Sequence, residues 1–310
     1  MLRGTLLWLS RRRALLHLVT RRSLPRAFAR RFVAGETLDD AVAAVRAVNA
    51  RGLSATLDLL GESVTSTAEA AVARDQIVQL VDRIVADRLD ANVSVKLTQL
   101  GLDVDPDVCR ANMIAILERA ARDGVFIRVD MEGSPFTELT LRLFREHLHP
   151  RFADRVGVVI QSMLRRSDHD VEDLIRMRAR VRLVKGAYVE SHQIAYPDKR
   201  DADAAFARQT QRLMDSGCYP AIATHDERLI TAAKAYARER GLGQERFEFQ
   251  MLYGVRRDLQ ERLRSEGYRV RVYVPFGTHW YPYLMRRLAE RPANIASITG
   301  SLLKEALSRA

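Results

Sequence analysis

A regular alternation of short β-branched runs with longer amphipathic stretches constrains the fold of this chain more than any other feature of its sequence. Beyond Gly35 we count eight candidate strands and eight helical stretches. Parallel strands need a crossover connection, which is usually a helix, so this alternation indicates βαβ units and a parallel sheet. Eight such units in roughly 250 residues are the size of a closed (β/α)8 barrel. We therefore predict an α/β fold with one barrel domain over residues 36–310.

The candidate elements follow one another without a linker rich in proline, glycine or serine. The strands are predicted at Leu53–Leu59, Asn92–Leu97, Val125–Asp130, Val156–Gln161, Val181–Lys185, Tyr219–Thr224, Arg246–Met251 and Tyr268–Val274. The helices are predicted at Thr67–Arg88, Asp107–Arg122, Thr137–Leu148, Asp168–Arg178, Ala202–Asp215, Asp226–Arg240 and Arg257–Ser265, with a last one after Tyr281.

An open, doubly wound sheet is the alternative arrangement of the same units. Such a sheet usually carries a glycine-rich phosphate turn after its first strand. The turn after the first predicted strand, Leu59–Val64, has no GxGxxG pattern, and the chain has no GxxxxGK[ST] motif. The closed barrel is therefore the simpler interpretation, and a P-loop is excluded.

Basic residues are concentrated at the N-terminus. Residues 1–35 hold nine of the 50 lysines and arginines and no acidic residue, so the rest of the chain carries 41 basic against 39 acidic side chains. No apolar run in this segment reaches the roughly 18 residues of a spanning helix. We therefore predict a basic amphipathic helical arm that lies on a membrane surface or docks on the core. A mitochondrial transit peptide and a nucleic-acid-binding arm are the other interpretations.

Several other chemistries find no support in the sequence. Cys109 and Cys218 belong to no CxxC or Cys/His pattern, so we expect reduced thiols and no structural zinc. The histidines are scattered, and His147 and His149 do not share a helix face because they lie two residues apart. No GxSxG motif is present. We therefore expect neither a metal centre nor acyl-transfer chemistry.

Polar side chains gather where the predicted strands end, which is the face that carries the active site in barrels of this kind. Lys96 and Arg182 each lie within an otherwise apolar strand, where a cation needs a partner or a ligand. Asp130 is the candidate partner for both. A solvated rim is the alternative for any one of these residues, and His225 also fits a core histidine bonded to a backbone carbonyl.

The last predicted helix brings two arginines to one tyrosine. Tyr283 stands three residues before Arg286 and four before Arg287, so all three side chains can share one helical face. A pair of guanidinium groups is suited to binding a carboxylate bidentately. An exposed arginine pair on a surface helix is the alternative.

These segments, taken in order, resemble the proline dehydrogenase family in its short monofunctional bacterial form, over residues 53–295. No single segment is specific, but together they stand in register with the eight predicted strands. The segments that carry the resemblance are Val93–Leu97, Arg128–Glu132, Val159–Gln161, Arg182–Tyr188, Ala223–His225, Tyr273–Gly277 and Tyr283–Leu288.

The resemblance implies a distorted (β/α)8 TIM-like barrel whose final helix lies over the barrel mouth. It implies FAD as the cofactor, held by Met131, Gln161, Arg182, Lys185, Gly186, Ala187, Thr224 and His225. It places the substrate carboxylate on Lys96, Arg286 and Arg287 and the walls of the substrate ring on Tyr273, Tyr283 and Leu252. Asp130 and Arg182 are the expected catalytic side chains: Arg182 acts through the electronics of the flavin, and Asp130 orients Lys96 or the flavin.

The implied activity is FAD-dependent oxidation of L-proline to 1-pyrroline-5-carboxylate, the first step of proline degradation to glutamate. Electrons are expected to pass to a membrane quinone. A separate pyrroline-5-carboxylate dehydrogenase is expected to take the product, because 310 residues leave no room for a second catalytic domain. The expected location is cytoplasmic, peripheral on the inner face of the cell membrane, and no nucleic acid partner is expected.

Two positions depart from the family pattern. Val189 stands where relatives often carry an aromatic residue, and Asp226 stands where asparagine is common. Tyr273 resembles the proline-specific members rather than those that prefer hydroxyproline. The alternative enzyme is methylenetetrahydrofolate reductase, another flavin barrel, which gives no reason for the arginine pair. A nucleic-acid-binding protein, the alternative from another class, leaves the residues at the strand ends unexplained.

Overall fold

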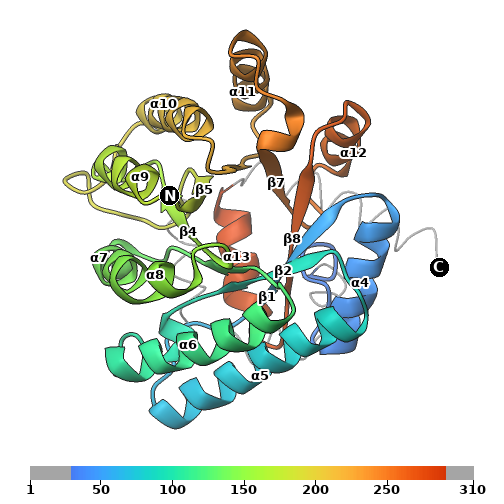
Figure 1. Cartoon of the computed structure of the whole chain (residues 1–310), viewed down its shortest axis with the longest axis vertical. Coiled ribbons are helices and arrows are strands. Elements are labelled where there is room, and N and C mark those ends of the chain that lie inside the picture. Colours follow the sequence, from blue (N-terminus) through green and yellow to red (C-terminus); the bar gives the residue numbers. More distant parts are fainter. Residues whose placement is uncertain (1–28, 291–310) are drawn as a thin grey trace.

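A closed barrel of eight parallel strands forms the centre of the protein, as seen in a computed structural model that describes residues 29–290 (Figure 1). Each strand pairs with its neighbours in sequence, and the first strand pairs with the last, which closes the barrel. The strands are β1 (Ser54–Leu59), β2 (Ala91–Val95), β3 (Ile127–Val129), β4 (Val156–Gln161), β5 (Arg180–Val184), β6 (Ala221–Ala223), β7 (Glu248–Leu252) and β8 (Val270–Phe276). The predicted (β/α)8 barrel is confirmed.

Helices surround this barrel and cover its outer face (Figure 1). The α-helices are α4 (Leu38–Ala50), α5 (Thr67–Ala86), α6 (Pro106–Arg122), α7 (Ser134–Leu143), α8 (His149–Phe152), α9 (Ser167–Arg176), α10 (Lys199–Asp215), α11 (Glu227–Glu239), α12 (Arg257–Ser265) and α13 (Trp280–Glu290). Short 3-10 turns lie at Thr98–Leu100 and Gln244–Arg246, and a π-helical turn at Phe144–Leu148 continues α7. None of the helices in this part of the chain has the length and hydropathy needed to cross a bilayer.

Local chemistry explains where the observed elements differ from the predicted ones. The predicted strand Tyr219–Thr224 is reduced to β6, because Tyr219 adopts a φ of 51° and Pro220 has no N–H to donate to a ladder. The predicted helix Thr137–Leu148 begins earlier, at Ser134, because Pro135 fits the first turn of a helix.

One helix before the first strand is missing from the prediction. Helix α4 is capped by Thr37, whose hydroxyl accepts a hydrogen bond from the Asp40 backbone N–H while the Asp40 carboxylate accepts one from Thr37 N–H. Ala41, Val45 and Val48 follow at helical spacing and are buried in the barrel core. The capping box and this periodicity are legible in the sequence, so the omission is an error of interpretation.

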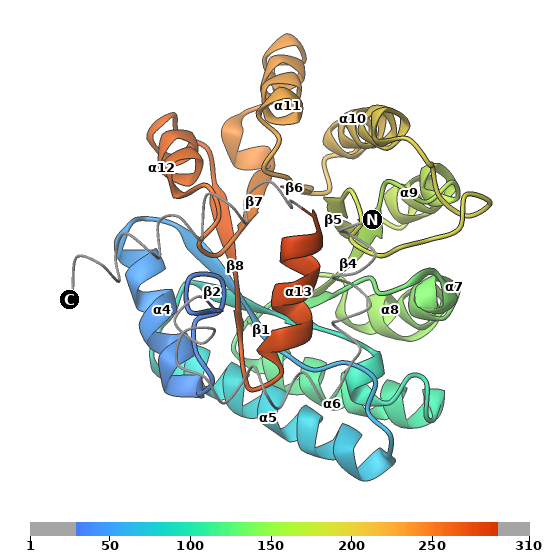
Figure 2. The same cartoon turned by 180° about the vertical axis from the view of Figure 1, so that it is seen from behind.

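The last helix lies over the mouth of the barrel and not in the outer ring (Figure 2). It has a hydrophobic cluster of its own, separate from the barrel core, in which Trp280, Tyr283 and Leu284 pack with Phe32 and Val33 of the N-terminal segment. The expectation of a final helix over the mouth is therefore confirmed. Of the predicted arm, residues 29–35 are described, and residues 1–28 lie outside the described part of the chain.

Close backbone contact fixes the N-terminal segment at this place. The Ala34 N–H donates to Pro275 O at 2.8 Å, and the Gly277 N–H donates to Gly35 O at 2.9 Å. Gly254 has a φ of 72°, and a Cβ atom there would lie 1.7 Å from the carbonyl oxygen of Arg31. The chain needs glycine at this position for two reasons, backbone conformation and space.

Gly254→Ala is therefore expected to cost more free energy of unfolding than Gly241→Ala. Gly241 has a similar φ of 62° but nothing within 4 Å of a built Cβ, so its substitution tests the conformational cost alone, about 1 kcal/mol. The steric clash at Gly254 adds about 2 kcal/mol. Urea unfolding of both variants measures the difference, and equal losses would show that the N-terminal segment is not held against Gly254.

Candidate active site

A cavity of about 440 Å³ opens at the carboxyl ends of the strands, beneath α13. Every residue that the sequence assigned to the site lines it: Lys96, Asp130, Met131, Gln161, Arg182, Lys185, Gly186, Ala187, Thr224, His225, Leu252, Tyr273, Tyr283, Arg286 and Arg287. The structure thus brings together side chains from seven strands or their ends and from α13. The role of each residue stays a prediction.

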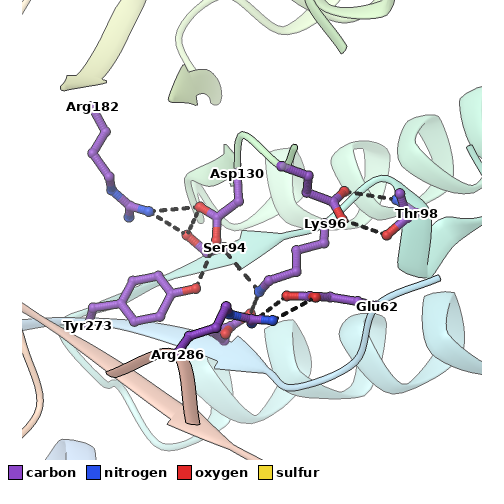
Figure 3. Close-up of polar contacts among 10 residues, drawn as sticks. Glu62, Ser94, Lys96, Thr98, Asp130, Arg182, Tyr273 and Arg286 are labelled. Atoms are coloured by element: carbon purple, nitrogen blue, oxygen red, sulfur yellow. Dashed lines mark hydrogen bonds and ion pairs between the residues drawn. The ribbon is translucent and has the colours of Figure 1, made fainter. Parts of the chain in front are cut away.

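Lys96 is buried between two carboxylates (Figure 3). Its Nζ lies 2.7 Å from Asp58 Oδ1 and 3.7 Å from Asp130 Oδ2. Burial works to lower the pKa of Lys96, but the attraction of the two carboxylates is stronger and raises that pKa above its ordinary value. Lys96 therefore carries its charge at any physiological pH.

Asp130 holds several groups of the cavity in place. Its Oδ1 accepts hydrogen bonds from Arg182 Nη1 at 2.8 Å and from the Ser94 hydroxyl at 3.0 Å, and its Oδ2 accepts one from the Tyr273 hydroxyl at 2.8 Å. Asp130 contacts both Arg182 and Lys96, which are the two cations for which the sequence indicated it as a partner. Burial and the neighbouring Asp130 charge raise the pKa of Tyr273 well above its ordinary value, so its hydroxyl stays a donor.

Polar residues of β7 and β8 orient Arg182. Its Nε donates to Gln250 Oε1, and Gln250 Nε2 donates to Glu248. Glu248 in turn accepts hydrogen bonds from Arg271 Nε at 3.0 and 3.2 Å. A chain of buried hydrogen bonds thus runs from Arg271 through Glu248 and Gln250 to Arg182. This chain fixes the orientation of the Arg182 guanidinium.

The two arginines of α13 have different partners. Arg286 forms a bidentate ion pair with Glu62, with Nη1 at 3.0 Å and Nη2 at 2.6 Å from the carboxylate oxygens. The Arg286 side chain is only 16% exposed, so the alternative of an exposed surface pair is wrong for this residue. Arg287 lies over the Tyr283 ring, with its guanidinium carbon 5.3 Å from the ring centre. The expected shared face thus holds for Arg287 and Tyr283, while Arg286 is directed to Glu62.

The residues expected to contact the cofactor also line the cavity. Lys185 Nζ lies 2.6 Å from Asp203 and 3.1 Å from Asp226, two carboxylates at the starts of α10 and α11. His225 Nε2 accepts a hydrogen bond from the Leu252 backbone N–H at 2.9 Å. His225 is therefore bonded to the backbone, as the alternative supposed, but to an N–H and not a carbonyl, and it also lines the cavity.

The residues of this site that the sequence analysis did not assign include Asp58, Ser94, Glu62 and Gln250. Asp58 stands between Leu57 and Leu59, so it is an isolated charge within an apolar strand. That is the same signal that identified Lys96, and it was available. Ser94 gives no such signal, because a serine in a strand is ordinary.

Glu132 is a buried carboxylic acid beside the cavity, only 5% exposed. Its two oxygens accept hydrogen bonds from Thr98, one from the backbone N–H at 3.1 Å and one from the hydroxyl at 2.6 Å. Burial raises the pKa of Glu132 from 4.5 to about 7, although the Thr98 hydrogen bonds oppose this shift. Glu132 thus titrates near neutral pH.

The geometry defines a class of protein: a closed (β/α)8 barrel with a charged cavity at the carboxyl ends of its strands, where enzymes of this fold carry out their chemistry. The model of one family, described as proline dehydrogenase, matches residues 41–299. The chain belongs to the proline dehydrogenase family.

Individual relatives agree with this assignment. The chain is 42% identical over 279 residues to a protein of Deinococcus radiodurans named proline dehydrogenase, covering 89% of this chain and 90% of the relative. It is 42% identical over 277 residues to proline dehydrogenase 1 of Bacillus subtilis, covering 89% and 91%. A bifunctional protein PutA of Escherichia coli is 27% identical, and the match covers 88% of this chain but 24% of that protein.

Solved structures show the same fold. The structure of proline utilization A from Bdellovibrio bacteriovorus inactivated by N-propargylglycine has a TM-score of 0.80 and 29% identity. That match covers 85% of this chain and 32% of the other. This chain therefore corresponds to about a third of that larger protein.

Replacing Glu132 by glutamine is expected to change how stability depends on pH. The folded protein retains a proton on Glu132 that the unfolded chain loses above pH 4.5, so this contribution is fully present below pH 4.5 and is lost as pH rises through about 7. Glutamine cannot ionise. The free energy of unfolding of Glu132→Gln relative to wild type should therefore rise by up to ~3 kcal/mol between pH 4.5 and 8.

Urea unfolding of both proteins at several pH values measures this difference. Glu245→Gln serves as the control, because Glu245 lies in the exposed turn before β7. A difference between wild type and Glu132→Gln that is independent of pH would show that Glu132 titrates at its ordinary value.

Proposed function

We propose that this protein oxidises L-proline to 1-pyrroline-5-carboxylate with FAD as its cofactor. The observation that carries the proposal is the set of cations around the cavity, with Lys96 buried among its strands and Arg286 and Arg287 above it on α13. Three cations at one cavity suit a small substrate with a carboxylate. Neither methylenetetrahydrofolate reduction nor nucleic acid binding explains why three cations lie at this cavity.

The carboxylate anchor leaves the reacting part of the ring free. A guanidinium has five N–H donors, so Arg286 retains donors for a carboxylate while it is paired with Glu62. Tyr273, Tyr283 and Leu252 also line the cavity and supply walls for a five-membered ring. Fixing the carboxylate orients the rest of a small substrate, and such orientation is a large part of catalysis.

The other residues that line the cavity fit a flavin. Arg182 Nη2 is buried and has no hydrogen-bond partner among the described residues, so this donor is available to a bound group. Lys185 offers a cation, and Gly186, with a φ of 118°, lets the backbone turn beside Met163. Met131, Gln161, Ala187, Thr224 and His225 complete this wall. When bound, FAD supplies the acceptor for the two electrons of the reaction.

The reaction balances without a dedicated protein base. Proline that binds with a neutral amine would give up a hydride from C5 to the bound flavin, which leaves a protonated C=N double bond between C5 and nitrogen. The proton on that nitrogen would then be released to solvent. Arg182 is proposed to tune the flavin by its charge, and Asp130 to orient Arg182 and Lys96 through its ion pairs with both. Tyr273 donates its hydroxyl proton to Asp130 and lines the cavity in which the substrate is proposed to bind.

Anaerobic addition of L-proline is expected to bleach the flavin band of the purified protein, because the electrons have no other acceptor. Arg286→Met should raise the KM for proline about 100-fold, since loss of a bidentate charged contact costs about 3 kcal/mol. Arg212→Met, which removes an exposed cation on α10, is the control and should leave KM unchanged. A flavin band unaffected by proline contradicts the activity, and an unchanged KM removes Arg286 from carboxylate binding.

We further propose that electrons leave through a membrane quinone and that a separate pyrroline-5-carboxylate dehydrogenase takes the product. The basic N-terminal arm gives the protein a means to approach an anionic bilayer. The proposed location is therefore cytoplasmic, peripheral on the inner face of the cell membrane, with the barrel domain beginning at Glu36.

Binding to phosphatidylglycerol vesicles is expected to fall as salt increases, because attraction between exposed charges is screened. Full-length protein with Arg11, Arg12 and Arg13 replaced by glutamine should sediment less with the vesicles. So should protein lacking residues 1–28, a deletion that spares the Phe32 and Val33 contacts with α13. Binding that is absent, or independent of salt and of these changes, would reject the membrane role of the arm.

A further inference from the structure

The loop between β1 and α5 carries Glu62 in a constrained conformation. Ser63 has a φ of 51°, a left-handed conformation that costs a residue with a side chain on the order of 1 kcal/mol. On the other side of Glu62, a Cβ on Gly61 would lie 2.6 Å from Gln99 Nε2. Glu62 is thus flanked by two positions where the backbone is strained or closely packed, and such positions persist only where the surroundings hold them.

Thr98 keeps the loop that carries Glu62 and Ser63 in this conformation. Its hydroxyl accepts a hydrogen bond from the Ser63 backbone N–H at 3.0 Å, and its carbonyl oxygen accepts one from Val64 N–H at 3.3 Å. Thr98 is fully buried. Two consecutive N–H groups of the strained loop are therefore bound to a single residue, which belongs to the turn after β2.

Glu132 fixes Thr98 in turn. The same hydroxyl that accepts from Ser63 donates to Glu132 Oε2 at 2.6 Å, and Thr98 N–H donates to Glu132 Oε1 at 3.1 Å. A single hydroxyl can donate and accept a hydrogen bond at once, and an alkyl side chain can do neither. Gln161 Nε2 donates to the Glu132 carbonyl oxygen at 2.9 Å, which ties this residue to β4.

Glu62, held by this loop, determines where Arg286 lies. The bidentate pair between Glu62 and Arg286, drawn with dashed lines in Figure 3, fixes the plane of the guanidinium and links the loop after β1 to α13. Hydrogen bonds therefore run without interruption from β4 and β3, through Glu132 and Thr98, to the loop of Glu62 and the arginine of α13.

We propose that Thr98 is a positioning residue for the substrate carboxylate: with Glu132 it fixes the loop that presents Glu62, and Glu62 orients Arg286. Thr98 is not among the residues that line the cavity, so it is proposed to act through Glu62 and Arg286. The proposal rests on the proposed function, in which Arg286 binds the carboxylate of L-proline.

The substitution Thr98→Val tests this, because valine has nearly the same shape and lacks the hydroxyl. We expect the KM for L-proline to rise about tenfold while kcat changes less than twofold, since the carboxylate lies away from the oxidised carbon. Thr98→Ser restores the hydroxyl and should restore KM. Thr140→Val is the matched control: Thr140 is a buried threonine on α7 whose hydroxyl has no partner among the described residues, so KM should not change.

A double-mutant cycle tests whether the effect passes through Glu62. In a Glu62→Gln background the Thr98→Val substitution should raise KM by less than twofold, because the ionic contact that Thr98 positions is already lost. If Thr98→Val does not fold, Glu132→Gln takes its place in the same cycle, since its amide cannot accept the Thr98 hydroxyl proton on the Oε2 side.

Three results would decide against the proposal: an unchanged KM in Thr98→Val, a kcat that falls as much as kcat/KM, or an equal rise in KM with and without Glu62. A wild-type protein that does not oxidise proline would reject the proposed function instead. The two failures are therefore distinguishable.

Discussion

The buried ion pairs at the carboxyl ends of β1, β2, β3 and β5 are the interaction on which the rest of the site depends. The Lys96 and Arg182 side chains are buried just after β2 and within β5, and taking a charge out of water costs several kcal/mol unless a partner is provided. Asp58 and Asp130 are those partners, and they come from other strands. The charges are balanced only when these strands take their places in the closed barrel, in which β4 separates β3 from β5.

These pairs also give the cavity its rigidity. Asp130 is bonded to Arg182, Ser94 and Tyr273, and Arg182 is bonded again to Gln250 below it. Each member has its orientation fixed by at least one neighbour, so little reorganisation is left for the moment of binding. The same network explains why the barrel interior at this end is polar, whereas barrels of this type are usually filled by branched apolar residues.

The sequence was sufficient for most of the fold because the periodicity of the strands and helices is a local property. It was also sufficient for the residues of the cavity, because the carboxyl ends of parallel strands meet at one face. The sequence was less informative where contacts between distant residues determine the direction of a side chain. The separate directions of Arg286 and Arg287 depend on the approach of Glu62, and the role of Thr98 depends on a loop 35 residues earlier whose Ser63 takes a left-handed conformation. Helix α4 and Asp58 were missed although their signals were present, and the functional roles of the site residues stay predictions.

The separate hydrophobic cluster of α13 has an energetic consequence. Trp280, Tyr283 and Leu284 pack with Phe32 and Val33 and not with the main core, so this helix and the N-terminal segment form one small cooperative unit. Such a unit opens at a free energy of its own, below that of global unfolding. Opening of this unit would uncover the cavity without unfolding the barrel. A substitution of Phe32 would weaken the contact between the N-terminal segment and α13. It would therefore alter how often the cavity opens, although Phe32 is far in sequence from most of the residues that line it.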